Sequence, residues 1–458
     1  MKKIFIGIIL SVITLLCPGQ GNDLDKGQVG YIPSAENLRN REWFRDAHFG
    51  MFIHWGVSSV IGKEIGWAVA GSDVDDYRQN MYKFDPEKFD AAAVVKLAKD
   101  AGMKYITFTT RHHDSFSMFD TKFSDWSIMH TPYGKDVLKM LADECQKQGI
   151  RLFCYYSLAD FFRPDYCQGN NKRGTGIKGD CNWDSYIQFM KNQLTEILTN
   201  YGPIYGVWFD GHWDQVERVN GKYGKQRRMW HYDEIYKLIH DLQPGCMIVN
   251  NHHLATFPGE DYQTFERDLP GQNTGGGFSG DAKISDELPL ETSDIIGRSW
   301  GYATNDTINR SVKELVHLLL GAAGSGANFL LNIGPMPDGE VRPAHRERLL
   351  GIGAWMKQYG ETIYGTRKSF MVPAEWGVAV EKGNFVYLHI TNPLKVNERL
   401  ALSDFPYKVI KAYRFETGRS VSFSEKRKTS DLIINVPELD KDAIDNVIVI
   451  EVKKLNKQ

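Results

Sequence analysis

Apolar residues at helical spacing alternate with short strand-like runs along the first two thirds of the chain. Between Phe89 and Thr110, an amphipathic stretch ends at Gly102 and is followed by a β-branched and aromatic run typical of a strand. The same unit recurs, with helices predicted over 137–145, 187–200 and 232–242 and strands over 152–157, up to 210, and over 247–251. Alternating helices and strands with short links form parallel sheets with right-handed crossovers, so the pattern predicts an α/β domain.

Three further strand candidates lie outside these units, at 48–55, 262–266 and 328–332. About eight strands fit a (β/α)8-like TIM barrel, which is the fold we expect. An open doubly wound sheet is the alternative, and the lack of a glycine-rich phosphate loop before the first helix weakens it. Residues 267–290, with three glycines at 275–277, are expected to form a long loop at the lip of the cleft.

The periodicity changes after Gly365. Runs at 378–380, 385–390, 407–414, 433–436 and 445–452 alternate at a period near two, which is typical of half-buried strands. We therefore expect a small C-terminal antiparallel β-sandwich. The predicted organisation is a signal peptide over 1–20, a catalytic barrel over 21–365 and the sandwich over 366–458.

The N-terminus has the pattern of a secretory signal. Lys2 and Lys3 precede an apolar run over 4–16, and Cys17-Pro18-Gly19 follows. The run is too short to span a bilayer, and no later segment reads as a membrane span. We expect an exported protein, periplasmic or extracellular. A lipid anchor on Cys17 is the less favoured alternative, because Leu16 occupies a position where that signal prefers a small residue.

Composition narrows the class of ligand. The 458 residues are 42 % hydrophobic and 24 % charged, as in a soluble globular protein. A formal net charge of −2 gives no electrostatic reason to expect nucleic acid as a partner. Aromatic residues make up 12 % of the chain, which suits clefts for flat, amphipathic ligands such as sugars, although most of these rings are expected to fill the core. Nothing in the composition indicates an oligomeric state.

Five cysteines follow Cys17, an odd number that leaves at least one thiol unpaired. Cys167 and Cys181 bracket the polar, glycine-rich segment 168–180, and an oxidising compartment would allow them to close it. Cys154 and Cys246 lie in apolar runs and are expected to be buried. The cysteine spacings are not those of a zinc site.

Asp210 is the most informative residue of the chain. It ends a strand-like run of large apolar residues, where a carboxylate is costly unless it is paired or used. Gly211 follows directly, so the chain can turn sharply and leave the carboxylate accessible. A structural ion pair at the strand end is the simpler but less favoured interpretation.

Polar residues recur at the predicted strand ends, where a barrel of this kind has its active site. The set comprises His54, His112, His113, Asp114, Tyr155, Tyr156, Asp160, Trp208, Asp210, Asn250, Asn251, His252 and Glu266. It resembles the α-L-fucosidases of glycoside hydrolase family 29. The matching stretches are Phe49–Gly56, Arg111–Phe116, Tyr155–Ser157, Val207–Asp210, Asn328–Pro335 and Asp338-Gly339. They run through nearly the whole predicted barrel in the family's order, and the family's barrel-plus-sandwich fold agrees with the pattern.

The resemblance implies that Asp210 is the catalytic nucleophile. A second carboxyl group must protonate the departing oxygen and then activate water. Glu266 matches the position that carries this acid in several members of the family, and Glu291, in the run Leu290-Glu-Thr-Ser, is the rival. We favour Glu266.

The resemblance also implies a set of sugar-binding residues. They are His54, Trp67, His112, His113, Tyr155, Trp208 and His252. Adjacent side chains on a strand point to opposite faces, so His112 and His113 can reach one sugar only if the strand ends or bulges there. Trp67 and Trp208 would offer apolar faces to the methyl group of fucose.

The chain departs from the family at several of these positions. Arg111 and Ser115 replace a lysine and a glycine around the paired histidines, and His252-His253 stands where many members have an arginine. The family's Glu-Trp pair is spread out as Glu64 and Trp67. These departures affect the leaving-group side of the site most.

The sequence thus predicts a retaining exo-α-L-fucosidase without cofactor or metal. It would release terminal fucose from fucosylated oligosaccharides or glycoconjugates by double displacement through a covalent fucosyl-enzyme intermediate. One alternative is a metal-dependent barrel hydrolase, in which the clustered histidines and aspartates hold zinc. The other is a non-catalytic carbohydrate-binding barrel.

Overall fold

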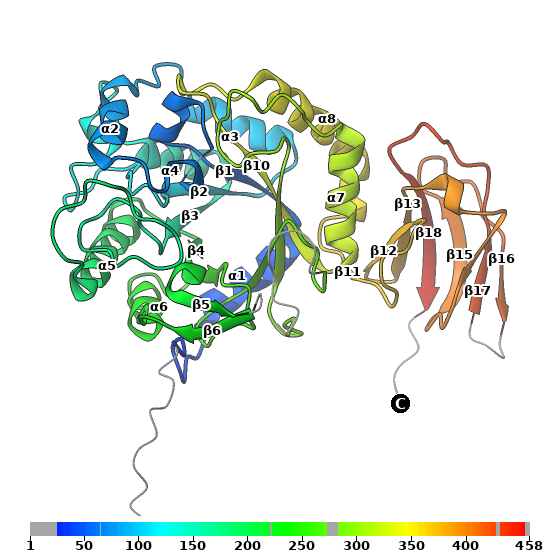
Figure 1. Cartoon of the computed structure of the whole chain (residues 1–458). Coiled ribbons are helices and arrows are strands. Elements are labelled where there is room, and N and C mark those ends of the chain that lie inside the picture. Colours follow the sequence, from blue (N-terminus) through cyan, green and yellow to red (C-terminus); the bar gives the residue numbers. More distant parts are fainter. Residues whose placement is uncertain (1–24, 65, 220–221, 273–282, 427–430, 454–458) are drawn as a thin grey trace, which may run out of the picture.

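The computed structural model of the chain consists of a large α/β barrel followed by a smaller all-β domain (Figure 1). The structure describes residues 25–453 except 65, 220–221, 273–282 and 427–430. The predicted signal peptide and Cys17 lie outside the described residues. Within them, no helix is long and apolar enough to cross a bilayer.

Eight parallel strands form the barrel in the order β7-β4-β3-β2-β1-β10-β9-β8. Their bounds are β1 (Phe49–Ile53), β2 (Tyr105–Arg111), β3 (Arg151–Ser157), β4 (Gly206–Asp210), β7 (Met247–Asn250), β8 (Gln263–Glu266), β9 (Leu290–Ile295) and β10 (Ala327–Ile333). The two end strands, β7 and β8, also lie next to each other, so the sheet is nearly closed. This is the predicted TIM barrel.

The helices form the outer layer of the barrel, except the first, whose Phe44 packs against Tyr105, Phe153 and Tyr262 of the barrel interior. They are α1 (Ala35–Ala47), α2 (Val74–Arg78), α3 (Ala91–Asp100), α4 (Val137–Gln148), α5 (Trp183–Asn200), α6 (Tyr232–Leu242), α7 (Val312–Gly324) and α8 (Pro343–Tyr359). Helix α4 ends where Gly149 adopts a left-handed conformation, as its sequence predicts. Helix α5 begins four residues before its apolar stripe, because the side chain of Asn182 accepts a hydrogen bond from the backbone of Ser185 and caps the helix there.

Strand β9 corrects the sequence prediction. The segment 267–290 was expected to be a loop, and no strand was predicted immediately after it. The structure places a six-residue parallel strand at Leu290–Ile295, between β8 and β10. Its charged and hydroxyl residues conceal the apolar pattern of a buried strand. A short hairpin, β5 (Val216–Val219) and β6 (Lys222–Gln226), was also not predicted.

Two antiparallel sheets make up the C-terminal domain, as predicted. One contains β11 (Arg367–Lys368), β12 (Gly377–Lys382), β13 (Phe385–Ile390), β18 (Asn446–Lys453) and β15 (Lys408–Arg414), and the other contains β14 (Arg399–Leu402), β17 (Asp431–Asn435) and β16 (Phe423–Lys426). A core of aliphatic and aromatic side chains fills the space between them. The opposite face of the larger sheet shares the barrel's core through Val378, Val380 and Tyr387, so the two domains are packed together.

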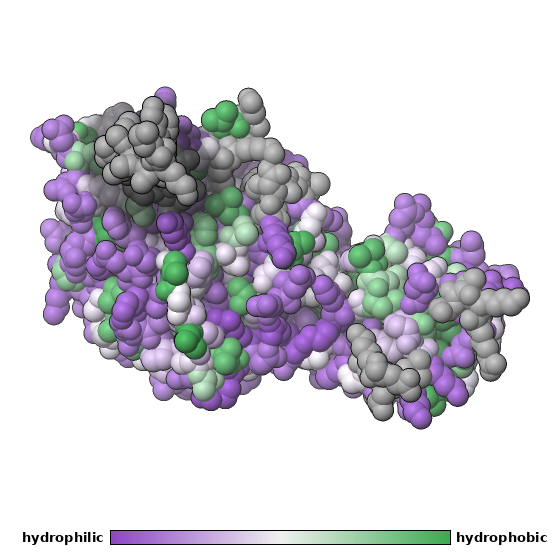
Figure 2. All heavy atoms as spheres, turned by 90° about the horizontal axis from the view of Figure 1, so that it is seen from below, coloured by the Kyte–Doolittle hydropathy of each residue, from purple (hydrophilic) through white to green (hydrophobic). Residues whose placement is uncertain are grey.

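Cys167 and Cys181 form a disulfide bond, with a Cα–Cα distance of 4.9 Å. Cys145, Cys154 and Cys246 are free and buried, in agreement with the odd count. The face of the molecule in Figure 2 is mainly hydrophilic, with hydrophobic residues scattered between charged ones.

Candidate active site

A pocket opens where the barrel strands end. It is lined by Phe52, His54, Trp67, His112, Tyr155, Trp208, Asp210, Trp213, Asn251, Glu266, Ser293 and Trp300. Strands β1, β3, β4, β8 and β9 each contribute at least one of these side chains. The carboxyl ends of five barrel strands therefore share this pocket.

Asp210 ends β4 and lies inside this pocket, with 13 % of its side chain exposed. Its Oδ2 accepts a hydrogen bond of 3.0 Å from the hydroxyl of Tyr155. Its Oδ1 accepts one of 2.8 Å from the backbone nitrogen of Gly211 and a long one, 3.4 Å, from the indole nitrogen of Trp213. These donors fix the orientation of the carboxylate.

Gly211 is required by the turn that follows. Its φ is +105°, and a Cβ at this position would come within 2.5 Å of the backbone nitrogen of Ala159. Any side chain would be strained on both counts. The glycine therefore lets the chain leave the strand immediately after Asp210, as expected.

Glu266 ends β8 and faces the same pocket, with 27 % of its side chain exposed. The side-chain amide nitrogen of Asn251 donates to Glu266 Oε2 at 2.9 Å and to Asp210 Oδ1 at 3.4 Å. The two carboxylate oxygens are therefore at most about 6.3 Å apart, the sum of those distances. Burial and the negative charge of Asp210 raise the pKa of Glu266 to about 7.

Glu291, the rival acid, lies elsewhere. It is on β9 with its side chain turned into the barrel interior, where no surface is exposed. It accepts hydrogen bonds from the hydroxyl of Tyr105 at 2.7 Å and from the indole nitrogen of Trp208 at 3.0 Å. Burial raises the pKa of Glu291 to about 7 as well. However, Glu291 does not line the pocket. Its hydrogen bond with Trp208 instead holds the indole of a residue that does.

His54 lines the pocket just beyond β1. The amide nitrogen of Asn332 donates to the carbonyl of Trp300, so its Oδ1 faces His54 and accepts from Nδ1 at 2.6 Å. Burial lowers the pKa of His54 to about 4. The ring is therefore neutral near pH 7, and its other nitrogen, Nε2, is an acceptor for a ligand hydroxyl.

His112 and His113 lie beyond the end of β2, which has a register irregularity between Thr109 and Arg111. His112 lines the pocket and stacks on Tyr155, with ring centroids 5.0 Å apart. His113 instead lies behind the nucleophile candidate: its Nε2 is 3.5 Å from Asp210 Oδ2, and its ring packs against Phe161. Burial lowers the pKa of both rings. The irregularity at the end of β2 thus lets both histidines lie near Asp210, although adjacent side chains of a regular strand would point to opposite faces.

Aromatic rings form the remaining walls. Trp67, which is 46 % exposed, stacks on Trp213 with centroids 4.8 Å apart. Trp208 stacks on Tyr155 at 5.5 Å. Trp300 completes the enclosure beside His54, at 5.1 Å. Such faces bind the apolar faces and methyl groups of sugars.

Several departures from the family pattern lie off the pocket. His252 is buried, and its Nε2 lies 3.0 Å from Glu260 Oε1 while its Nδ1 accepts from the backbone of Leu254, so the geometry gives no support to its predicted sugar contact. Glu64 accepts from the backbone nitrogen of Trp300 at 2.6 Å and does not line the pocket. Arg111 is buried in an ion pair with Asp160.

Five pocket residues were not among the predicted site residues: Phe52, Asn251, Trp213, Ser293 and Trp300. Asn251 lies at a predicted strand end, but its sequence position indicates no role. Trp213 follows Asp210 by three residues, a spacing that could have drawn attention to it. Ser293 lies on β9, the strand that the sequence pattern does not predict, and nothing in the sequence indicates that Ser293 lines the pocket.

One group of side chains has the spacing of a metal site. His112, His113 and Asp210 each offer one ligand atom, and these atoms lie within 4.8 Å of one another. Asp210 Oδ2 already accepts a hydrogen bond from Tyr155, and the imidazole of His113 donates through Nδ1 to the hydroxyl of Ser157, since that hydroxyl donates to Ala159. His113 Nε2 and His112 Nδ1 have no hydrogen-bond partner among the described residues, so these nitrogens could accept a metal ion as well as a ligand hydroxyl, and a chelation experiment decides between the two.

Comparisons with known proteins agree with this geometry. The family model described as alpha-L-fucosidase matches residues 21–361, and the chain belongs to this family of glycoside hydrolases. The chain is 27 % identical over 395 residues to tissue alpha-L-fucosidase of Bos taurus, covering 78 % of this chain and 75 % of that one.

Solved structures are similar over almost the whole chain. Alpha-L-fucosidase isoenzyme 1 from Paenibacillus thiaminolyticus has a TM-score of 0.78 and 28 % identity, covering 92 % of this chain and 100 % of that one. A family 29 alpha-L-fucosidase from Bacteroides thetaiotaomicron has a TM-score of 0.76 and 25 % identity, covering 94 % and 99 %. That protein was captured as a covalent intermediate with 2-fluoro-fucosyl fluoride in a glutamate-to-glutamine variant.

Proposed function

We propose that this protein is a retaining exo-α-L-fucosidase in which Asp210 is the nucleophile and Glu266 the acid/base. The observation that carries the assignment is the amide of Asn251, which donates to both carboxylates and keeps their oxygens within about 6.3 Å. Retaining glycosidases have their carboxyl groups about 5 to 5.5 Å apart, and inverting ones about 6.5 to 9.5 Å. The covalent intermediate of the Bacteroides relative supports the same class of mechanism.

In the first step, a carboxylate oxygen of Asp210 attacks the anomeric carbon of a terminal fucosyl residue. The glycosidic C–O bond breaks, and the proton of Glu266 passes to the departing oxygen. Its raised pKa keeps Glu266 protonated for this task near neutral pH. Burial and Asp210 raise the pKa of Tyr155, so its phenol stays a neutral donor to the nucleophile.

In the second step, Glu266 takes a proton from water. The water oxygen attacks the anomeric carbon, and the bond to Asp210 breaks and releases its carboxylate. Asn251 donates to whichever of the two carboxylates is ionised, which supports both halves of the cycle.

The pocket suits one sugar at the end of a chain. Its wall of four tryptophans restricts it to a small ligand and offers an apolar face to the methyl group of fucose. Buried polar atoms without a protein partner include His112 Nδ1, Ser293 Oγ and Asn251 Oδ1. Leaving such atoms unpaired is costly, so a polyhydroxylated ligand that pairs with them is favoured.

Turnover of 4-nitrophenyl α-L-fucoside tests this function directly. Release of 4-nitrophenol by the wild type, with a loss of at least about 10³-fold in the isosteric variant Asp210→Asn, is expected. A wild type that binds fucose without turnover would instead support a carbohydrate-binding barrel. Activity that is lost on dialysis against EDTA and restored by zinc would support the metal-dependent hydrolase.

We also propose that the mature protein is exported, with the barrel over 21–365 and the sandwich over 366–458. The sequence pattern of the first 20 residues supports export. The disulfide between Cys167 and Cys181 is of a kind that persists in oxidising compartments. N-terminal sequencing of the secreted protein tests the cleavage site and separates it from acylation of Cys17.

A further inference from the structure

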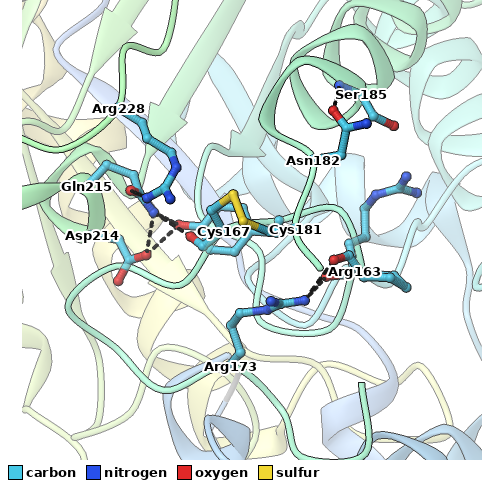
Figure 3. The surroundings of a disulfide bond; sticks show 11 residues. Arg163, Cys167, Arg173, Cys181, Asn182, Ser185, Asp214, Gln215 and Arg228 are labelled. Carbon is cyan, nitrogen blue, oxygen red and sulfur yellow. Dashed lines mark hydrogen bonds between the residues drawn. A yellow bond between two sulfur atoms is a disulfide. The ribbon is translucent and has the colours of Figure 1, made fainter. Parts of the chain in front are cut away.

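The loop that the disulfide closes packs against the segment that follows the nucleophile candidate. Figure 3 shows Asp214 and Gln215 beside the Cys167–Cys181 bond. The side-chain amide of Gln215 donates to the carbonyl of Cys167 at 2.7 Å, and Asp214 accepts from the backbone nitrogen of Asn171 at 2.8 Å. Asp214 and Gln215 are both fully buried. The loop therefore covers the short helix His212–Gln215 (η5) that carries Trp213.

Gly169 permits this close approach. A Cβ at Gly169 would come within 1.9 Å of the carbonyl oxygen of Asp214 and 2.4 Å of its carboxylate. Only a residue without a side chain lets the two backbones meet here. Because Arg173 also donates to the carbonyls of Arg163 and Pro164, the far side of the loop is fixed as well.

Asn170 makes the decisive contacts. Its backbone nitrogen donates to the carbonyl of Asp214 at 2.7 Å. Its side-chain nitrogen donates to the carbonyl of Val216 at 2.6 Å and to that of Trp213, and its Oδ1 accepts from Arg227 at 2.7 Å. One amide thus uses both of its hydrogens to hold the backbone on either side of η5. This arrangement requires a side chain with two donors and an acceptor.

The backbone held in this way positions a pocket wall. The indole of Trp213 lines the pocket, reaches Asp210 Oδ1 at 3.4 Å and stacks on Trp67 at 4.8 Å. A displacement of η5 would move this indole away from both the sugar and the nucleophile. Displacement of a wall residue weakens the binding of the ligand that it contacts.

We propose that the Cys167–Cys181 loop is a positioning element for the fucose pocket, and that Asn170 is the residue through which it positions Trp213. The inference rests on the proposed function, since it assigns the loop to the same pocket. Asn170 itself touches neither the sugar nor the reacting atoms.

The isosteric variant Asn170→Asp tests this inference. The aspartate keeps an acceptor for Arg227. Its second carboxylate oxygen, however, replaces the amide nitrogen that donates to the carbonyls of Trp213 and Val216, so both hydrogen bonds are lost. We expect KM for 4-nitrophenyl α-L-fucoside to rise about 10-fold while kcat changes by less than about 3-fold, because a binding wall is disturbed. Asn171→Asp is the matched control: it changes charge identically in the same loop, and only the backbone of Asn171 contacts Asp214. Its kinetics should stay those of the wild type.

A second readout does not depend on turnover. The near-ultraviolet circular dichroism of stacked tryptophans should change in Asn170→Asp and in the double variant Cys167→Ser/Cys181→Ser, but not in Asn171→Asp. Asn170→Ser removes the donations without adding charge and serves if the aspartate variant does not fold.

Asn170 variants with a lowered Tm but unchanged KM and dichroism would overturn the inference. If the wild type does not turn over the fucoside, the proposed function fails, and the dichroism alone decides whether the loop positions Trp213.

Discussion

Asp210 and Glu266, on the non-adjacent strands β4 and β8, accept hydrogen bonds from the same amide nitrogen, that of Asn251. Two carboxylates this close cannot both be ionised without repulsion, so the charge of Asp210 adds to burial in raising the pKa of Glu266 to about 7. Asn251 opposes the shift by donating to Glu266. The geometry therefore gives one group the character of an acid while the other stays a nucleophile.

Removing the side chain of Asn251 should shift the alkaline limb of the kcat/KM profile to higher pH. Activity requires protonated Glu266, so kcat/KM of the wild type should fall as the pH rises through about 7. Asn251→Ala deletes a hydrogen bond that lowers the pKa of Glu266, so this alkaline limb should move to higher pH, with a rate loss of about 10- to 100-fold. Profiles of kcat/KM between pH 5 and about 9 check this. An alkaline limb that stays in place or moves down contradicts it.

Glu266 and Glu291 should respond differently to azide. Glu266→Ala lacks the acid and the base, so it should lose activity most with poor leaving groups and recover turnover of the 4-nitrophenyl fucoside when azide replaces water. Glu291→Ala should show no such rescue, because Glu291 lies outside the pocket. The decisive comparison is the azide dependence of both variants on one substrate. Full activity of Glu266→Ala on a poor leaving group, together with rescue of Glu291→Ala, would make Glu291 the acid/base.

Glu291 should contribute to the pH dependence of stability, as should Glu266, whose pKa is raised to the same value. The pKa of Glu291 is about 7 in the folded state and 4.5 in its ordinary environment, so the native protein binds an extra proton between these values. The stabilisation that comes from protonated Glu291 is fully present below pH 4.5. It is lost as the pH rises through about 7, which lowers the free energy of unfolding by up to about 3 kcal/mol. Glu291→Gln should therefore flatten the fall in unfolding free energy over this window. Urea unfolding at several pH values measures it, and an equally steep fall in the variant would contradict the assignment.

Ser293 should contribute a hydrogen bond to the sugar. It lies directly opposite Glu266 in the pairing of β8 and β9, and its buried hydroxyl has no protein partner. Ser293→Ala should lower kcat/KM about 10-fold, the effect of one hydrogen bond. Thr107→Val is a matched control, because Thr107 also has a buried, unpartnered hydroxyl but does not line the pocket. Equal kinetics in the two variants would exclude a role for Ser293 in binding.

The sequence predicts the fold and the centre of the site because both depend on local patterns. Gly102 and Gly149 mark helix ends, and Asp210 stands out against the apolar run before it. Strand β9 escapes prediction because Glu291 and Asp294 give a buried strand a polar sequence, and these side chains find partners only in the closed barrel. The same limit applies to Asn251, whose importance depends on two carboxylates from other strands.

His252 shows a different limit of the sequence. Its position at a strand end predicts a sugar contact, but Glu260, eight residues later, turns the ring away from the pocket. The contact between His252 and Glu260 depends on the path of the loop after β7, and no periodic pattern in the sequence predicts that path. Trp213 and Trp300 escape prediction for a related reason, since aromatic residues in loops have no periodicity that tells a pocket wall from the core.

The most direct test is to identify the residue that carries the sugar. Glu266→Gln is incubated with 2-fluoro-fucosyl fluoride, so that a nucleophile displaces fluoride from the anomeric carbon and the fluorosugar ester persists. Mass spectrometry of the intact protein and of its peptides then locates the adduct. A single 2-fluoro-fucosyl group on the peptide containing Asp210, absent in Asp210→Asn, is the result predicted. An adduct on another residue, or a wild type that turns over the fucoside with inversion at the anomeric carbon, would contradict the account.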